Sequence, residues 1–588
     1  MNKKTKLRYE NLEHQPQKNN EEFVKKLSDI PEETTDPPVS CISRPFLNEA
    51  KLNIKIAFPV MITNIFQYSL TIETTSFAGR LTATELEGVG LALSLVGALG
   101  WCICTGMVSA CDTMFAQSFG STDKKRTGLF LQRGLLLTNL IPIFLWSLHI
   151  NLEPLLILCG QDRQISRVAG EFMTCFTPGI TFMMNYLLLA RYMQDQGCLW
   201  PPVIAGICGN VFNICFQLLF VTYLQFGFKS AALCHAFSFG IMTLVEALYI
   251  WKSKFYLNTW PGFQLEAFYD WFPMLKLGLA GMGHTTFEVL VWEASVFMGG
   301  LLGTVQVATQ SIMIQILYIS FMLYYGCGIA SNIRVGQCLG ANRPNQAKQA
   351  YRAGIFNTAI STIILATSII LLRYQIPLVF TNKKEVLEMT IDTMPYIFVI
   401  LYCDPFSGVC SGTLRGCARQ LSGCMIIFVS FYMISLPVSI VASFVYDLGV
   451  KGIWIGPTCG CIVAVSSIFL LLECQDWKNQ AYLAQRRIFS KLADIENDET
   501  EKLIYSLEID NIAENGPDSH IRTPSHPIMC STEIFDTSAP RTNLEKSIIW
   551  KRVAIFGCAI LFLLCGIFIH LFVPLELYRG TNFTLNQF

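Results

Sequence analysis

Between residues 54 and 473 the chain consists of apolar stretches of about twenty residues, separated by short polar loops. A helix needs about 20 mostly apolar residues to cross the hydrocarbon core of a bilayer. Over the whole chain 52% of the residues are hydrophobic and only 15% are charged, whereas an average soluble domain is about 25% charged. The pattern therefore predicts an all-α polytopic membrane protein.

The apolar stretches predict thirteen transmembrane helices, twelve in one block and one near the C-terminus. The expected spans are 54–77, 86–109, 128–150, 168–190, 199–224, 230–251, 272–298, 305–328, 350–372, 388–411, 421–445, 450–473 and 552–574. Lysine and arginine gather in the loops after the second, sixth, eighth and tenth spans, with Lys383 and Lys384 as the main exceptions. Because positively charged loops stay in the cytoplasm, we expect a cytoplasmic N-terminus and an extracellular C-terminus.

An internal repeat relates the two halves of this block. SACDTMFAQSFG (109–120) aligns with ASNIRVGQCLG (330–340) at an offset of 220 residues, so that Gln117 matches Gln337 and Gly120 matches Gly340. Parallel repeats of six spans are a transporter architecture, with the substrate site between the lobes. We therefore expect two six-helix lobes related by a parallel repeat, plus a thirteenth helix.

These features divide the chain into seven regions. They are a disordered cytoplasmic tail (1–45), a first lobe (46–250), a cytoplasmic linker (251–271), a second lobe (272–474), a cytoplasmic tail (475–550), a thirteenth transmembrane helix (551–575) and an extracellular C-terminus (576–588).

The expected seventh span carries two carboxylates, Glu288 and Glu293, and a histidine, His284. A charged carboxylate at the centre of a membrane helix costs about 2.5–3.5 kcal/mol on insertion scales, and such residues usually serve function. Five residues separate the glutamates, so they point about 140° apart on an ideal helix. We expect one to face the central cavity and the other a lobe interior, where removal from water favours the protonated form. Two roles are open for His284. It can tune the proton site at Glu288, or it can be a polar residue near the membrane interface.

Further candidates lie in other spans. The repeat places Glu73 of the first span on Glu293, and for Glu73 a structural role and a transport role are both open. Asp404 precedes Pro405, which lacks a backbone N–H, so we expect a broken helix able to coordinate a cation. Trp292 and Tyr318 can hold a cation over a ring face, with helix packing as the alternative.

Several segments together resemble the multidrug and toxin extrusion (MATE) transporters, in particular the animal branch. They are SACDTMFAQSFGS (109–121) with the following LQRG (131–134), FEVLVWE (287–293), RVGQCLGA (334–341) and SGTLRG (411–416). The resemblance implies export of organic cations and xenobiotics by alternating access, in exchange for protons or sodium. It also implies that Glu288 and Glu293 are the transport glutamates of the seventh helix, and that Asp404 replaces a tenth-helix glutamate.

Two departures bear on substrate range. Gln315 stands where mammalian members have an eighth-helix glutamate, and can hydrogen-bond a ligand without a charge. Val289 stands where they have an aromatic residue. Asp112, Arg133, Arg334 and Arg415 lie near the expected cytoplasmic helix ends, where we interpret them as gate or loop contacts.

The expected function is therefore a secondary active antiporter of organic cations, with the proton as coupling ion and sodium as the alternative. A flippase-like exporter of lipid-linked or other metabolite substrates is the alternative function. It is disfavoured because the spans lack the central arginines expected of a flippase, apart from the borderline Arg191. The 43 basic and 43 acidic residues balance, which suggests no nucleic-acid partner. No nucleophile–base pair or phosphate-binding loop points to an enzyme, a cofactor or a metal. A monomer in the plasma membrane is expected.

Overall fold

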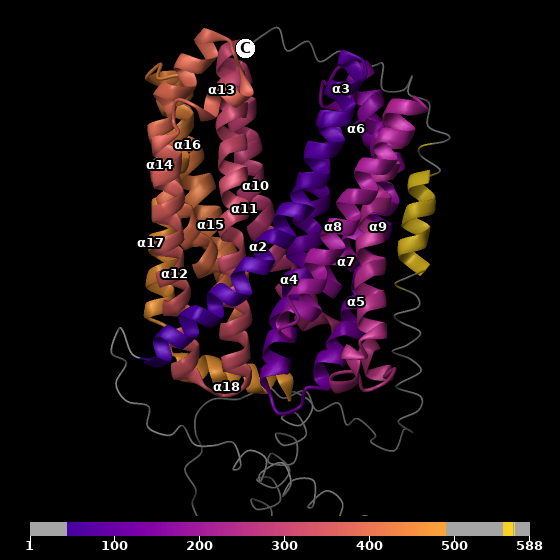
Figure 1. The fold of residues 1–588 in the computed structure, drawn as a ribbon, viewed down its shortest axis with the longest axis vertical. Coiled ribbons are helices and arrows are strands. Elements are labelled where there is room, and N and C mark those ends of the chain that lie inside the picture. The colour runs from indigo at the N-terminus through magenta and orange to yellow at the C-terminus, as the bar shows by residue number, and fades with distance from the viewer. Residues whose placement is uncertain (1–43, 490–554, 556, 568–569, 571–588) are drawn as a thin grey trace, which may run out of the picture.

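The computed structural model describes residues 44–489, 555, 557–567 and 570, and every regular element among them is a helix (Figure 1). The all-α prediction is therefore confirmed for this part of the chain. Eleven of its helical segments are long and apolar enough to cross a membrane. They are Ala83–Gly120, Arg126–Ile150, Arg163–Asp195, Trp200–Tyr223, Phe228–Lys252, Trp271–Leu302, Thr304–Gly340, Pro344–Leu371, Lys384–Gly416, Gln420–Val445 and Val450–Glu473.

The first and last expected spans stand apart from these eleven. Helix α2 (Arg44–Ala78) has 35 residues and contains the expected first span, but it is not among the helices that are apolar enough to be counted with the eleven. Of the thirteenth span expected at 551–575, the structure describes the apolar helix Gly557–Ile567 and the helical residues 555 and 570. Most of the predicted tails, and all of 576–588, lie outside the described residues.

The first half of the chain forms a bundle, here named the N bundle. Its helices are α3 (Ala83–Leu95), α4 (Cys102–Gly120), α5 (Arg126–Ile150), α6 (Leu152–Leu158), α7 (Arg163–Asp195), α8 (Trp200–Gln217) and α9 (Phe228–Lys252), with π-helical stretches η1 (Val96–Trp101) and η2 (Leu218–Tyr223). A buried core with Phe115, Phe172 and Met183 holds them together.

The second half forms the C bundle. Its helices are α11 (Thr304–Gly340), α12 (Pro344–Leu371), α13 (Ile376–Phe380), α14 (Lys384–Gly416), α15 (Gln420–Phe428), α16 (Leu436–Ile440) and α17 (Val450–Glu473), with π-helical stretches η5 (Val429–Ser435) and η6 (Val441–Val445). A separate core surrounds Trp454 and Met394. The prediction of a broken helix at Asp404 is wrong, because α14 continues through Pro395 and Pro405.

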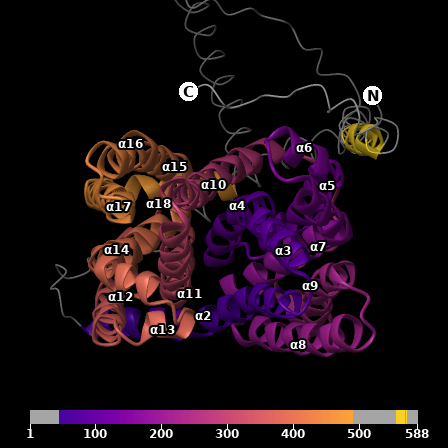
Figure 2. The same cartoon turned by 90° about the horizontal axis from the view of Figure 1, so that it is seen from above.

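Two helices cross from one bundle to the other, on opposite sides of the molecule (Figure 2). The first half of α2 lies on the C bundle, where Asn357 Nδ2 donates to Ala50 O at 2.9 Å. Its second half lies on the N bundle, where Asn210 Nδ2 donates to Phe66 O at 2.8 Å. Each half of α2 thus belongs to a different core.

Helix α10 (Trp271–Leu302) crosses in the opposite sense. Its first half packs against α4 of the N bundle, so closely that a side chain on Gly106 would collide with the Met282 backbone. Its second half lies on the C bundle, where the Trp292 and Trp454 rings are 5.9 Å apart between centroids. The two crossing helices join the bundles on both sides.

One end of the molecule, here named the α18 face, carries helix α18 (Trp477–Ile488) (Figure 1). The 251–271 linker lies at this face against the N bundle, with short 3₁₀ helices η3 (Phe255–Asn258) and η4 (Leu265–Phe268). Tyr192 and Thr259 share a hydroxyl hydrogen bond of 2.6 Å there. The opposite end, the α13 face, carries α6 and α13, and the bundles diverge toward it.

At the α18 face the bundles meet directly, in what is here named the inter-bundle interface. Thr113 Oγ1 of α4 donates to Arg415 O of α14 at 2.9 Å, and Gln420 Nε2 of α15 donates to Thr113 Oγ1 at 2.8 Å. Both contacts are in the interior of the protein, where a hydrogen bond is costly to leave unmade. The interface therefore holds the bundles together at this face.

Candidate functional site between the bundles

Glu288 and Glu293 lie on α10 where it passes between the bundles, and both are partly exposed. The Glu288 carboxyl group interacts electrostatically with Asp404 and Arg415 of α14. Glu293 instead accepts a hydrogen bond from the Ser94 hydroxyl of α3. The two glutamates therefore face different partners, as their angular separation predicts.

Asp404 is buried, with 7% of its surface exposed. Its carboxylate accepts a hydrogen bond from the Tyr324 hydroxyl of α11. Arg415 also interacts with Tyr325, whose ring centroid is 6.0 Å from the guanidinium carbon. Glu288 thus belongs to a cluster of two carboxyl groups, one guanidinium group and two phenols.

Aromatic rings surround the other glutamate. Tyr318 of α11 interacts electrostatically with Glu293 and, more weakly, with Glu288. Its ring centroid lies 6.5 Å from that of Tyr68 of α2, and the Tyr68 hydroxyl donates to Gln315 Oε1 at 3.2 Å. The predicted residues Gln315, Tyr318 and Glu293 therefore come together, with Tyr68 as a fourth member.

Trp292 does not join them. It is buried in the core of the C bundle against Trp454 and Phe431. Trp454 in turn donates its indole N–H to Gln310 Oε1 at 2.7 Å. Trp292 therefore packs between helices, which is the alternative to cation binding that the sequence left open.

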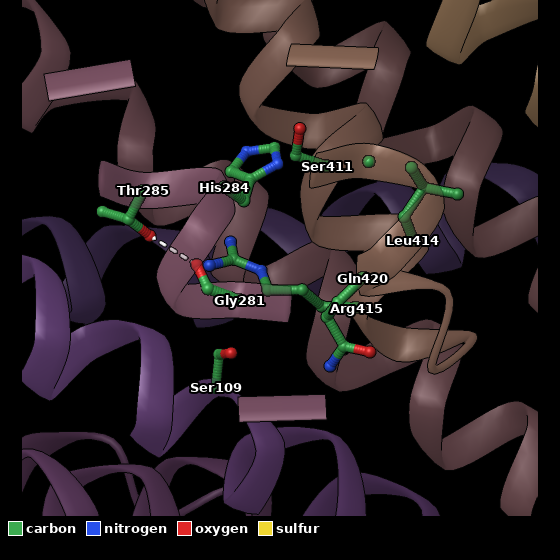
Figure 3. A pocket seen from close by; sticks show the side chains of 9 residues that line it. Ser109, Gly281, His284, Thr285, Ser411, Leu414, Arg415 and Gln420 are labelled. Carbon is green, nitrogen blue, oxygen red and sulfur yellow. Dashed lines mark hydrogen bonds between the residues drawn. The ribbon is translucent and has the colours of Figure 1, made fainter. Parts of the chain in front are cut away.

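His284 lies near Arg415 and hydrogen-bonds to the backbone of Gly423 in α15. It lines a small cavity of about 20 Å³ together with Ser109 of α4 and Gln420, a volume sufficient for one water molecule. Figure 3 shows the Arg415 side chain reaching from α14 toward this part of α10. His284 thus belongs to the inter-bundle interface, not to a helix end in water.

Glu73 lies in the N bundle, apart from the α10 carboxylates. It accepts a hydrogen bond from Asn213 Nδ2 of α8 at 2.7 Å. The neighbouring Thr74 accepts a hydrogen bond from Gln217 Nε2 at 2.9 Å and contacts His235 Nδ1 at 3.3 Å. Glu73 is therefore at the edge of a polar network inside one bundle.

Three site members were not predicted from the sequence. They are Tyr68 in the second half of α2, Ser94 of α3 and Cys102 of α4. Cys102 interacts with both Glu288 and Glu293. Nothing in their local sequence separates them from packing residues. Tyr68 offers a weak signal, since it precedes the intramembrane Glu73 by five residues.

The MatE family model matches residues 59–219 and 282–441, which lie in the two halves of the chain. The chain belongs to the MATE family. Multidrug and toxin extrusion protein 2 of Oryctolagus cuniculus is 32% identical over 446 residues, which cover 76% of this chain and 74% of the relative. Multidrug and toxin extrusion protein 1 of Xenopus tropicalis is 28% identical over 548 residues, 92% of this chain and 95% of the relative.

Solved structures agree with this MATE assignment at the level of the fold. The crystal structure of the eukaryotic MATE transporter AtDTX14 superposes with a TM-score of 0.73 at 23% identity, covering 76% of this chain and all of that one. An outward-facing multidrug resistance MATE family transporter superposes with a TM-score of 0.66 at 16% identity, covering 76% of this chain and 100% of that one. This protein is therefore a multi-pass membrane transporter of the multidrug and toxin extrusion type.

Proposed function

We propose that this MATE transporter exports organic cations and xenobiotics across the plasma membrane in exchange for protons. The observation that carries the proposal is the different surroundings of the two α10 carboxylates. Glu293 lies beside Tyr318 and faces the N bundle, whereas Glu288 lies beside Asp404 and Arg415. Helix α10 thereby contributes to two sites. In the aromatic site, Glu293 lies beside tyrosine rings, and in the paired-carboxyl site, Glu288 lies beside Asp404.

The aromatic site suits an organic cation. A cation over a tyrosine ring gains about 0.5–2 kcal/mol, and Tyr68 and Tyr318 lie 6.5 Å apart between centroids. Glu293 supplies the opposite charge and Gln315 an uncharged hydrogen-bonding group. Such a site recognises charge and aromatic contact rather than one particular molecule, which fits multidrug transport.

The paired-carboxyl site suits the proton. Glu288 and Asp404 carry two potential negative charges, and Arg415 supplies one positive charge. Uncompensated charge inside a protein is costly, so a single proton stabilises the pair. Because Glu288 and Glu293 both act on Tyr318, protonation of one site alters the field at the other. Cation and proton then compete, which is the physical content of antiport.

Alternating access follows from the two bundles. We propose that they act as two lobes of six helices related by the repeat, with α2 and α10 as the crossing first helix of each lobe. The contacts at the α18 face support assignment of this structure to an outward-facing state, and we propose that the transporter acts as a monomer. The positively charged loops support a cytoplasmic location for that face. A thirteenth helix then takes the C-terminus outside the cell.

Uptake of radiolabelled tetraethylammonium under an imposed pH gradient tests this function. E288Q and E293Q are each expected to abolish gradient-driven uptake. E388Q is the matched control, since Glu388 is exposed and forms a surface ion pair with Lys384, at 3.8 Å. Full gradient-driven uptake in both site variants would overturn the assignment, and replacement of the proton gradient by a sodium gradient identifies the coupling ion.

A further inference from the structure

A second pair of carboxyl groups lies near the α18 face. Asp112 of α4 and Asp195 at the end of α7 have 2% and 0% of their surfaces exposed. Their carboxyl groups are hydrogen-bond neighbours. Neither belongs to the site around Glu288 and Glu293.

These carboxyl groups lack hydrogen-bond donors. Both oxygens of Asp195 and Oδ1 of Asp112 are buried and accept no hydrogen bond from any described residue. An ionised carboxylate can only accept, so two ionised aspartates cannot bond to each other. A proton on one of them supplies the missing donor and creates an O–H···O bond between the pair. Without it, each of these buried acceptors stays unpaired, which destabilises the closed protein.

Two guanidinium groups, one from α7 and one from α14, face the pair. Arg191 of α7 interacts with Asp195, but one of its N–H groups is directed to Gln194 Oε1 at 2.9 Å. Arg415 of α14 interacts with Asp112, and it also interacts with Tyr325 of α11 and Glu288 of α10. The thiol of Cys111 also neighbours both aspartates, and Tyr325 lines the same cavity as Asp112 and Arg191.

The charge balance of this region also requires protons. The interior holds four carboxyl groups in two pairs, Glu288 with Asp404 and Asp112 with Asp195. Two guanidinium groups, Arg191 and Arg415, face them. With all four carboxyl groups ionised, two negative charges would stay uncompensated in a medium that stabilises charge poorly. One proton on each pair restores neutrality.

The pair lies where the bundles must separate for access from the α18 face. Asp112 and Asp195 belong to the N bundle, whereas Gln337 of the C bundle donates Nε2–H to Asp195 O at 2.6 Å. A cavity of about 10 Å³ between the bundles is lined by Asp112, Arg191 and Arg415, among others. This volume is at the lower limit for one water molecule. Separation of the bundles would hydrate both carboxyl groups.

We propose that Asp112 and Asp195 form a second proton-binding site, which holds one shared proton while the α18 face is closed. Opening that face hydrates the pair, and a hydrated aspartate is ionised at neutral pH. The O–H bond then breaks and the proton passes to water at the α18 face. Both aspartates stay ionised until that face closes again. The proton transfer during transport rests on the function proposed above, whereas the bound proton itself does not.

Infrared spectroscopy of the full chain in lipid tests for the shared proton. The C=O stretch of a protonated carboxyl group is separate from the bands of carboxylates and amides. At neutral pH, D112N and D195N are each expected to lose the same component of this band, and E388Q is expected to keep it. A band that neither D112N nor D195N changes would overturn the proposal. Asparagine is nearly isosteric and retains a hydrogen-bond donor, so both variants are expected to fold, which thermal unfolding checks.

Alkylation of native cysteines tests the link to opening. Cys417 is buried at the inter-bundle interface and Cys474 is exposed, so peptide mapping after N-ethylmaleimide treatment gives their labelling ratio. D195N carries the same two thiols, so its ratio controls for the ordinary effect of pH on thiol reactivity. We expect it to rise with pH in the wild type, by up to about tenfold per pH unit for one released proton, and to be flat in D195N. An equal rise in D195N would contradict the proposed coupling.

The two proposals can fail separately. If E288Q and E293Q transport normally while D195N loses the carboxyl band, the proposed antiport is wrong and the second proton site stands. If the glutamate variants are inactive while D112N and D195N leave the carboxyl band and the alkylation ratio unchanged, only the second proton site is wrong.

Discussion

Gln117 and Gln337 make the same contact in opposite directions across the inter-bundle interface. Gln117 Nε2 donates to Gly416 O of the C bundle at 2.8 Å, and Gln337 Nε2 donates to Asp195 O of the N bundle at 2.6 Å. The two glutamines lie 220 residues apart, at matching positions of the sequence repeat. The repeat therefore supplies both halves of the contact that holds the α18 face closed.

An arginine fixes each of these glutamines. Gln117 Oε1 accepts from Arg487 Nη1 of α18 at 3.0 Å, and Gln337 Oε1 accepts from Arg334 Nη1 at 2.8 Å. Because each amide oxygen is held in this way, each amide N–H₂ group is directed at the opposite bundle. The orientation of the glutamines is thus set by charged groups at the helix ends.

Removal of these glutamines is expected to favour opening of the α18 face. Each of Q117A and Q337A deletes an inter-bundle hydrogen bond, which is buried for Gln117 and partly buried for Gln337. Each leaves a carbonyl without its donor, at a cost of about 1–3 kcal/mol where the group is buried. Cys417 alkylation, measured relative to Cys474, should increase in each variant and more in the double variant. Q164A is the control, because Gln164 is exposed. Equal alkylation in all four proteins would contradict a role in closure.

Arg487 is expected to act as a strap between α18 and both bundles. It donates to Gln117 Oε1 of the N bundle and to Cys417 O of the C bundle, at 3.0 and 3.2 Å. R487A should therefore speed hydrogen exchange in α18 and at the interface, and R487K should restore little, because lysine lacks the planar fork that reaches two acceptors. The neighbouring Arg486 is exposed, so R486A should match the wild type. An R487A exchange pattern equal to that of R486A would rule out the strap.

The Tyr324 hydroxyl is expected to matter for transport, through Asp404. Y324F removes the only hydroxyl that donates to the Asp404 carboxylate among the described residues. Hydrogen bonds to charged groups contribute about 1.5–3 kcal/mol, so tetraethylammonium exchange should slow by about tenfold or more. Y402F serves as control, since Tyr402 is on the same helix and 41% exposed. Unchanged exchange in Y324F would remove Tyr324 from the proton site.

Two substitutions of Glu73 distinguish the effect of its charge from the effect of its hydrogen bond. E73Q keeps an oxygen that can accept from Asn213 Nδ2, now 2.7 Å from Glu73 Oε2, whereas E73A leaves that amide without its acceptor. We expect E73A to lower the free energy of unfolding by about 1–3 kcal/mol and E73Q to leave it nearly unchanged while reducing exchange. Thermal unfolding and tetraethylammonium exchange measure the two effects. Normal exchange in E73Q would assign Glu73 to packing alone.

Trp292 is expected to stabilise the C bundle instead of binding the cation. Its ring is buried between Phe431 and Trp454, and truncation of a buried Trp to Ala costs about 3–5 kcal/mol. W292A should lower the thermal stability strongly, and W292F should lower it less while preserving the order of preference among cationic substrates. A stable W292F protein with an altered order of preference would instead support a role at the cation site.

The sequence predicted many members of the candidate site but not their grouping. Glu288, Glu293, Gln315, Tyr318 and Asp404 all lie between or beside the two bundles, because acids and amides in apolar helices are rarely placed without partners. Trp292 illustrates the limit of such reasoning. An indole at that position can face a cavity or a core, and only the packing of α15 to α17 around it decides which.

The apolar periods and the repeat in the sequence determined a helical membrane protein with two related halves, since bilayer thickness fixes helix length and intramembrane carboxylates carry a desolvation cost wherever they lie. The tertiary structure decided what those carboxylates face. The crossing of α2 and α10 brings Tyr68 to Gln315 and Glu293 to Ser94, and closure of the α18 face brings Arg415 near Asp112. These pairs join residues far apart in the chain, and their distances depend on how the two bundles pack, which no local sequence pattern encodes.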